Sequence, residues 1–316
     1  MRRSSAIRAA AWGVVVAGTA APLARKRVRA PALLVQAIAF TAPVGLCVAV
    51  RRSRARDVAA CCLQMWAYVA AYKHPHDIPE VQREKTHFKY PIVADRVLGL
   101  GELPSVRLQR ALARVGPSGP EWSALDASLV WAHWSWFMVP HGSIAYLLWR
   151  HPERFPRAAA FMYSTFNVGA SFYWVLPTAP PWYAAAEGVP GADGPPAVRR
   201  MMVEYGEHFW RDGWGPLYSV FGGNPLAAMP SLHFATSLMA ALLLAEVGAL
   251  PGALGFGYLI ALGFALVYLG EHYLVDLLGG AALTAAVRRL APRAGPLAAR
   301  FGGLVGELEA MAHARA

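Results

Sequence analysis

Two short polar clusters interrupt an otherwise membrane-like stretch near the C-terminal end of the sequence. The first runs from Met229 to His233 (MPSLH), and the second runs from Glu271 to Asp276 (EHYLVD). Between them Glu246 is the only charged residue, and the stretch from Gly252 to Gly270 has none. The length of this uncharged stretch is close to the roughly 20 apolar residues that a helix needs to cross a bilayer. We therefore predict a helix from Leu232 to about Ala245, a Gly/Pro turn and a return helix. Such an antiparallel hairpin brings both clusters to the same end.

The residue types in these clusters suit phosphoryl transfer. His272 and Asp276 are four residues apart, so on a helix they share one face, where the carboxylate accepts one imidazole N–H and leaves the other ring nitrogen free. Ser231 follows a proline directly before an apolar helix, which predicts an N-cap, and helix N-termini bind phosphate through unpaired backbone N–H groups. His233 falls in the first turn of that helix. We predict that His272 attacks phosphorus to form a phosphohistidine, Asp276 supports it and His233 protonates the leaving oxygen.

Each of these residues has a plainer interpretation when it is taken alone. A histidine in a helix is more often packed or capping than catalytic, and Ser231 by itself is an ordinary N-cap. The presence of both clusters at one end of a hairpin favours catalysis, because ionisable groups inside a membrane are costly and usually functional.

Together, the clusters resemble the last two signature motifs of the type 2 phosphatidic acid phosphatase superfamily. Met229 to His233 and His272 to Leu277 are similar in particular to the branch that contains inositol phosphorylceramide synthase. The Pro-rich stretch Leu176 to Tyr183 resembles an element that precedes the motifs in that branch, and the similarity covers roughly residues 125 to 290. The resemblance implies a membrane enzyme, without a cofactor, that transfers a phosphoryl or phospho-alcohol group of the inositol-phosphate type to or from a lipid.

The sequence also departs from the phosphatase pattern. The first phosphatase motif places a Lys seven residues before an Arg-Pro pair, and this sequence has no such pattern; the Arg expected six residues before His272 is Leu266. These departures favour the synthase-like branch. The phosphate charge is then met by the helix terminus at Ser231 or by cations of the preceding loop, for which the candidates are Arg199, Arg200 and Arg211.

Composition assigns the chain to the membrane. Of its 316 residues, 56% are hydrophobic and 16% are charged, which is more apolar than an average soluble protein. The net charge of +11 would also fit a nucleic-acid-binding protein, but the basic residues cluster at the ends of apolar runs, as membrane topology signals do. We therefore expect the bilayer and a phospholipid or lipid-phosphate substrate as partners, and no nucleic acid.

The apolar runs predict an all-α, polytopic membrane bundle of six to eight helices. We expect three parts: an N-terminal membrane anchor and interfacial segment, a catalytic transmembrane domain and a cytoplasmic tail, at residues 1–120, 121–290 and 291–316. Between Tyr90 and Val115 apolar residues alternate with arginines in the pattern of an interfacial amphipathic helix.

Several individual spans are also expected. Met1 to Ala24 is interpreted as an uncleaved anchor, Pro31 to Val50 as a span, and Val58 to Tyr72 as a short span or an interfacial helix. Ala127 to Trp149 and Ala158 to Leu176 follow as spans, and the last helix is expected to end near Val287. In the first of these two, His133 and His141 are interpreted as packing or hydrogen-bonding groups, with a place in the substrate cavity as the alternative.

Two polar stretches admit competing interpretations. His74-Pro75-His76-Asp77 has residue types that bind metals, but its proline and the lack of a matching ligand set favour a turn, and no metal is predicted. Pro177 to Ala228 is predicted as a long loop that acts as a lid or acceptor-binding element. The alternative interpretation of its densest polar group is a solvated loop surface; this group comprises Glu207, His208, Arg211 and Asp212.

Short basic segments predict the orientation. The loop from Arg150 to Arg157 and the tail after Val287 lie opposite the catalytic end, so the positive-inside tendency places them in the cytoplasm and the active site outside. The abundance of Ala, Gly and Arg is associated with bacterial chains, and we expect an integral plasma membrane protein.

Three functions stay open on the sequence alone. The inositol-phosphate-type transferase is the first choice, and a lipid phosphate or prenyl diphosphate phosphatase is the alternative. The transferase uses a hydroxyl lipid as acceptor, whereas the phosphatase uses water. A non-catalytic transporter or scaffold that reuses the bundle is the third.

Overall fold

The structure is a computed structural model that describes residues 2–73, 83–117, 119–189, 198–221 and 223–314. It is mostly helical, so the predicted all-α fold is confirmed. Among the described residues, three segments are long and apolar enough to cross a membrane: Ser4–Arg25 within α1 (Arg2–Val28), α2 (Ala32–Ala49) and α14 (Ala249–Tyr268). These spans indicate an integral membrane protein; the total of six to eight membrane helices stays a prediction. The His74–Asp77 stretch lies outside the described residues.

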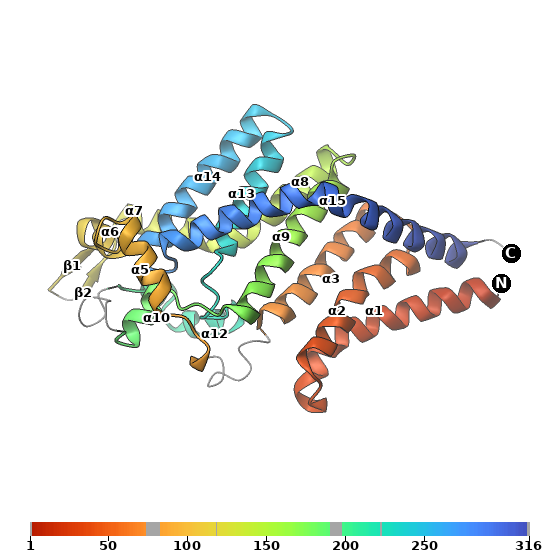
Figure 1. Cartoon of the computed structure of the whole chain (residues 1–316), viewed down its shortest axis with the longest axis horizontal. Coiled ribbons are helices and arrows are strands. Elements are labelled where there is room, and N and C mark those ends of the chain that lie inside the picture. The colour runs from red at the N-terminus through yellow and green to blue at the C-terminus, as the bar shows by residue number, and fades with distance from the viewer. Residues whose placement is uncertain (1, 74–82, 118, 190–197, 222, 315–316) are drawn as a thin grey trace.

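The N-terminal helices form a layer beside the helical bundle of the C-terminal half. Helices α1, α2 and α3 (Arg54–Lys73) pack side by side, and α3 in turn contacts α9 (Phe155–Val175) (Figure 1). The predicted end of the last helix near Val287 is wrong, because α15 runs from Leu274 to His313 through two prolines. Its C-terminal half packs against α1 and α2, and Glu309 pairs with Arg56 of α3 at 2.9 Å; this packing favours the helical conformation.

The interfacial segment forms two short amphipathic helices, α5 (Lys89–Leu98) and α6 (Pro104–Leu112). Ile92 of α5 is buried, whereas Val93 and Val97 leave 61% and 72% of their surface exposed. The two helices are amphipathic, as expected, and their place at the membrane interface stays a prediction. After α6 the chain makes a two-stranded antiparallel hairpin of β1 (Arg114–Gly116) and β2 (Gly119–Glu121), with Arg114 opposite Glu121.

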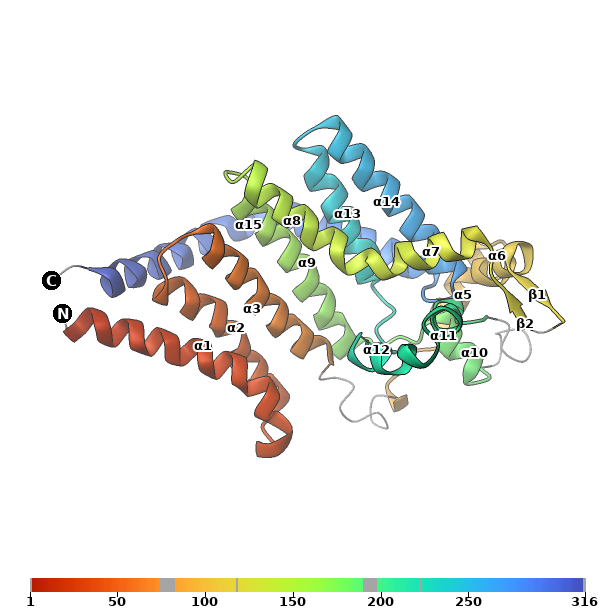
Figure 2. The ribbon, with the colours of Figure 1, turned by 180° about the vertical axis from the view of Figure 1, so that it is seen from behind.

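One expected span is broken in two. In place of a single helix over 127–149, the structure has α7 (Ala124–Trp134), a short 3-10 turn (Ser135–Phe137) and α8 (Met138–Arg150). Pro140 follows the turn; it lacks an N–H and its ring crowds the carbonyl four residues earlier, which disfavours a continuous helix here. Figure 2 shows α7 and α8 as successive pieces that pass in front of α13.

The stretch 177–228 is not a plain loop, contrary to the sequence prediction. It contains α10 (Pro181–Ala186), α11 (Met201–Trp210), a 3-10 turn (Arg211–Gly213) and α12 (Trp214–Phe221). Helix α11 is amphipathic, and its Met201, Met202 and Tyr205 are buried against α7 and α14. This packing supplies the stabilisation that short helices lack in isolation.

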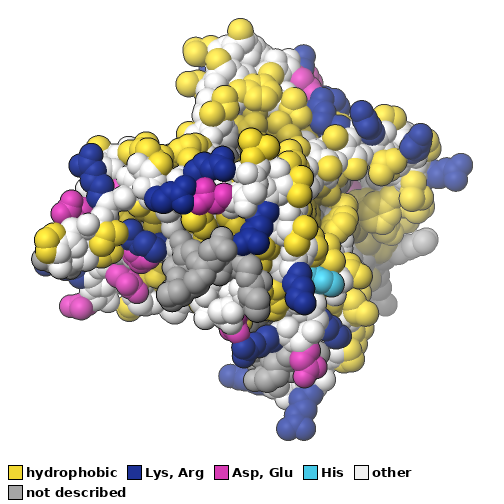
Figure 3. Space-filling model, turned by 60° about the vertical axis from the view of Figure 1, so that its left-hand side comes forward, with side chains coloured by type: hydrophobic (Ala, Val, Ile, Leu, Met, Phe, Trp, Pro, Cys, Tyr) yellow, Lys and Arg dark blue, Asp and Glu magenta, His cyan; other side chains and the backbone are white. Residues whose placement is uncertain are grey.

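At the centre of the second bundle, α13 (Leu232–Ala245) packs against α8, α9, α14 and α15. At the end remote from the motifs, Glu246 accepts hydrogen bonds from Arg157 and Arg288 and its backbone carbonyl accepts one from Arg154. Partial burial favours the neutral acid, but the bonds from Arg157 and Arg288 outweigh it and lower the pKa of Glu246. The basic segments expected on one side therefore meet at the turn between α13 and α14. On the face in Figure 3, hydrophobic side chains cover much of the surface and the charged groups are mostly Lys and Arg.

Candidate active site

The hairpin of α13 and α14 brings the two polar clusters into contact. Nδ1 of His233, in the first turn of α13, lies 3.1 Å from Nε2 of His272, which follows the end of α14. The two residues are 39 positions apart in the chain. The predicted convergence of the clusters at one end of the hairpin is therefore confirmed.

His272 and Asp276 interact, but not across the face of a helix as their spacing suggested. His272 precedes α15, Tyr273 is its N-cap, and Asp276 is the third residue of its first turn. Asp276 reaches back so that its Oδ2 lies 3.2 Å from Nδ1 of His272, and the same oxygen accepts a hydrogen bond from the Tyr273 N–H at 2.9 Å. Both side chains are buried, with Asp276 fully so. The pairing therefore depends on the start of the helix.

This chain of contacts indicates which ring nitrogens carry protons. A carboxylate accepts only, so Nδ1 of His272 donates to Asp276 and Nε2 keeps its lone pair in the neutral ring. Nδ1 of His233 then donates to that lone pair. A nucleophilic nitrogen and a proton donor thus face each other across 3.1 Å.

Ser231 joins the two motifs. Its hydroxyl accepts a hydrogen bond from the Phe234 N–H at 3.3 Å, which confirms the predicted N-cap. Its own backbone N–H donates to the carbonyl of Asp276 at 3.0 Å, and the residue is fully buried. On the other side, the Tyr173 hydroxyl of α9 donates to the carbonyl of Pro230 at 2.9 Å. These bonds fix the start of α13 relative to the start of α15.

Two aromatic rings flank His233. The His133 ring of α7 stacks on it with centroids 5.1 Å apart, and the Trp136 ring lies at 4.2 Å. Trp136 is held by a hydrogen bond from its indole N–H to the Thr236 hydroxyl at 3.0 Å. His133 is therefore a packing group, as first interpreted, and its place in a substrate cavity stays a prediction. Trp136 could not be recognised as a neighbour of the site from the sequence, because tryptophans are also common at membrane interfaces.

Arg200 is the loop cation that contacts the second cluster. Its guanidinium bonds to the carboxylate of Glu271, the residue before His272, at 3.0 Å and stacks over the Trp182 ring at 3.7 Å. Trp182 in turn donates its backbone N–H to the Gly270 carbonyl. Arg199, by contrast, lies just before α11 and pairs with Glu204 of that helix.

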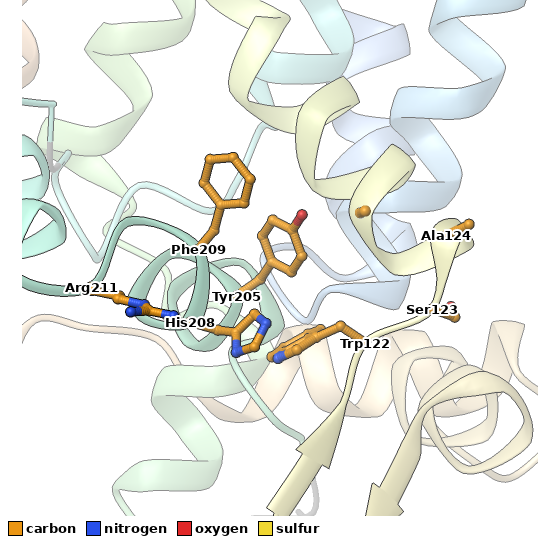
Figure 4. A pocket seen from close by; sticks show the side chains of 8 residues that line it. Trp122, Ser123, Ala124, Tyr205, His208, Phe209 and Arg211 are labelled. Carbon is orange, nitrogen blue, oxygen red and sulfur yellow. The ribbon is translucent and has the colours of Figure 1, made fainter.

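Arg211 lies elsewhere, in the exposed turn after α11. It borders a cavity of about 490 Å³ between α11 and the start of α7, whose wall is largely aromatic (Figure 4). The lining residues are Trp122, Ser123, Ala124, Ala127, Tyr205, His208, Phe209 and Arg211, and none of these belongs to the histidine pair. The role of Arg211 in phosphate binding stays a prediction.

The Pro-rich element supports the approach to the first motif. Thr178 is fully buried; its N–H donates to the Leu226 carbonyl, and its own carbonyl accepts from the Ala228 N–H. Its hydroxyl lies 2.7 Å from that of Tyr90, on α5. The interfacial segment is thus bound to the same framework as the two motifs.

The comparison with protein families agrees with this geometry. Residues 122–290 match the PAP2 superfamily, and the chain belongs to it. Proteins of this superfamily are typically lipid phosphatases or phosphotransferases.

A more specific similarity points to the branch that the motifs resembled. The chain is 32% identical over 120 residues to the inositol phosphorylceramide synthase catalytic subunit aur1 of Schizosaccharomyces pombe. The alignment covers 36% of this chain and 27% of that protein, so the chain spans about a quarter of the length of the relative it matches. No solved structure matches it.

Proposed function

We propose that this protein transfers a phosphoryl or phospho-alcohol group of the inositol-phosphate type to or from a membrane lipid through a phosphohistidine. The observation that carries the proposal is the line from Asp276 through His272 to His233, with separations of 3.2 and 3.1 Å. In this line, His272 is the buried nucleophile and Asp276 is the carboxylate that orients it. His233 is the proton donor, beside the ring nitrogen that Asp276 leaves free.

In the first step, Nε2 of His272 attacks phosphorus and the bond to the leaving oxygen breaks. His233, protonated on both ring nitrogens, gives that oxygen one proton and becomes neutral, and Asp276 stabilises the positive charge that develops on the His272 ring. In the second step, the acceptor oxygen attacks phosphorus, its proton passes to His233, and the bond between nitrogen and phosphorus breaks. The phosphorus must enter between the two rings, so their 3.1 Å contact opens when a donor binds.

Arg200 is the cation that we propose for phosphate binding. The stacking of its guanidinium on Trp182 and its bond to Glu271 hold it beside His272. It takes the place of the arginine that the phosphatase motif has at the position of Leu266. An anionic donor competes with Glu271 for the guanidinium. This planar group can donate two parallel N–H bonds to a phosphate.

The identity of the acceptor separates the transferase from the phosphatase. The similarity to an inositol phosphorylceramide synthase subunit supports a hydroxyl lipid as acceptor. Membership of the PAP2 superfamily keeps hydrolysis of a lipid phosphate or prenyl diphosphate as the second candidate. We also propose that the site faces the outer side of a bacterial plasma membrane, since Arg154, Arg157 and Arg288 gather at the opposite end of the bundle.

The test uses the full chain in proteoliposomes with phosphatidic acid, phosphatidylinositol and a prenyl diphosphate, each with and without a hydroxyl lipid. Products are read by lipid mass spectrometry. We expect a product in which phosphate or inositol phosphate is joined to the hydroxyl lipid, and no such product from His272→Ala. The matched control is His141→Ala, which removes an imidazole whose Nδ1 bonds to a backbone carbonyl of the bundle. Free phosphate alone would favour the phosphatase, and inert wild-type protein would refute both.

A further inference from the structure

A buried carboxylate from outside the matched region holds the start of the helix that carries Asp276. Asp95 of α5 is fully buried. One of its oxygens accepts from the Leu274 N–H at 3.0 Å, and the other accepts from the Val275 N–H at 2.8 Å. Residues 122–290 match the superfamily, so Asp95 belongs to the part of the chain that the match leaves out.

These two N–H groups are the first two of α15, which begins at Leu274. The first N–H groups of a helix have no partner within it, and the helix dipole favours negative charge there. Asp276 accepts the N–H of the N-cap residue Tyr273, so the two carboxylates together bind three consecutive amides. The direction of the first turn of α15 is therefore set by a side chain that lies 179 residues earlier in the sequence.

That first turn determines how Asp276 is placed relative to His272. Asp276 lies in it, one residue beyond Val275, and reaches back to His272 at 3.2 Å. A rotation of the turn would move the carboxylate away from the imidazole without breaking the helix. Helix α5 lies against the start of α15 (Figure 1), and the apolar side chains of Ile92, Leu103 and Tyr273 pack in the same cluster.

We propose that Asp95 is a positioning residue for phosphoryl transfer, which holds the first turn of α15 so that Asp276 keeps His272 in its attacking orientation. This assignment rests on the proposed function. Asp95 touches neither substrate nor the reacting atoms, and it acts through Asp276.

The surroundings of Asp95 make this support dependent on pH. Burial raises the pKa of Asp95 to about 6, although the hydrogen bonds from Val275 and Leu274 oppose that rise and the charge of Asp276 adds to it. Asp276 and the phenol of Tyr273 are the titratable groups of α15 that act on it. On α6, Arg107 and Arg110 bind Glu102 instead.

The test compares wild type with Asp95→Asn, which mimics the protonated acid and can accept from only one of the two amides. Glu102→Gln is the matched control, because Glu102 lies in the same α5–α6 hairpin, bonds to arginines on the surface and does not contact α15. At about pH 7.5 we expect kcat of D95N to fall about 10-fold, with KM changed less than about 3-fold, and E102Q to match wild type. As the pH falls to about 5, the gap between D95N and wild type should close, because wild-type Asp95 is then protonated as well.

A gap of the same size at both pH values would indicate a general structural role and overturn the proposal, as would a D95N enzyme as fast as wild type. Should D95N not fold, hydrogen exchange of the wild-type protein decides: after correction for the intrinsic pH dependence of exchange, the amides of Leu274 and Val275 should be less protected at about pH 5 than at about pH 7.5, and equal protection refutes the proposal.

Hydrogen exchange supplies a readout that does not require turnover. The peptide that contains Leu274 and Val275 should exchange faster in D95N than in wild type or E102Q, and unchanged exchange overturns the proposal. Inert wild-type protein would count against the proposed function, whereas active wild type with unaffected D95N would count against Asp95 alone.

Discussion

Replacing Gly280 with alanine is expected to separate the two catalytic motifs. Gly280 lies where α15 crosses the start of α13, and an added Cβ would stand 2.6 Å from the Ser231 carbonyl oxygen and 3.2 Å from the Ala235 nitrogen. Real Cβ atoms essentially never come within 3.0 Å of another heavy atom, and a backbone atom cannot rotate away. The two helices must therefore move apart by at least about 0.4 Å, and by about 0.8 Å to reach ordinary contact.

This movement acts on the histidine pair directly. Ser231 is two residues before His233, and its N–H is bonded to the Asp276 carbonyl, four residues before Gly280. The separation of 3.1 Å between Nδ1 of His233 and Nε2 of His272 is already near the upper limit for a hydrogen bond, so such a shift breaks the bond. We expect a rate loss of about 10- to 100-fold, since displacements near 1 Å cost up to about 100-fold, and a stability loss of about 1–3 kcal/mol from overpacking.

The assay measures initial rates and trapped phosphoenzyme on protein that is monodisperse and folded by thermal melting. Gly257→Ala on α14 is the matched control: no atom lies within 4 Å of its added Cβ, so it should keep full activity and gain up to about 1 kcal/mol of helix stability. A folded G280A protein with the wild-type rate would show that the spacing of α13 and α15 does not set the distance between the histidines.

Three further outcomes are expected. With a nitrophenyl phosphodiester, whose leaving group needs no acid, His233→Ala should recover a large part of its lost rate and His272→Ala none; equal failure of both would remove the acid role of His233. In a background without native cysteines, a cysteine at the exposed Ala186 should react with an impermeant reagent on intact cells, whereas one at Glu153 should react only after lysis, and the reverse would invert the topology. The pKa of Asp95 in the folded protein is raised to about 6 from 3.8, so wild type should lose stability relative to D95N as the pH rises between these values, by up to about 3 kcal/mol. A difference between the two melting curves that does not change with pH would contradict this.

Part of the candidate site followed from local sequence alone. The uncharged run between the clusters has the length of a membrane helix, and a serine after proline before an apolar stretch has the pattern of an N-cap. Both signals concern neighbouring residues, so the hairpin and the meeting of His233 with His272 could be inferred without a structure. The mutual proximity of His272 and Asp276 was also expected, although the bond forms at a helix start and not along a helix face.

Other local signals were overridden by packing. The patterns around 127–149 and after Val287 suggested one continuous span and an early helix end. In the structure, a turn at Ser135–Phe137 interrupts the first, and α15 continues to His313 beside α1 and α2. Helix boundaries of this kind depend on which neighbours bury the helix, which intrinsic propensity does not report.

The sequence by itself therefore determined the membrane class, the hairpin and the three residues proposed for catalysis, because each depends on composition or on spacing within one segment. Only the tertiary structure decided which distant groups surround them: the ring of His133 and that of Trp136 on His233, Arg200 beside Glu271, and Asp95 on the first turn of α15. These contacts join residues up to 180 positions apart, and the crossing of the helices determines which residues meet. Burying the Asp95 carboxylate is costly unless its oxygens accept hydrogen bonds, and only the folded chain places the amides of Leu274 and Val275 within its reach.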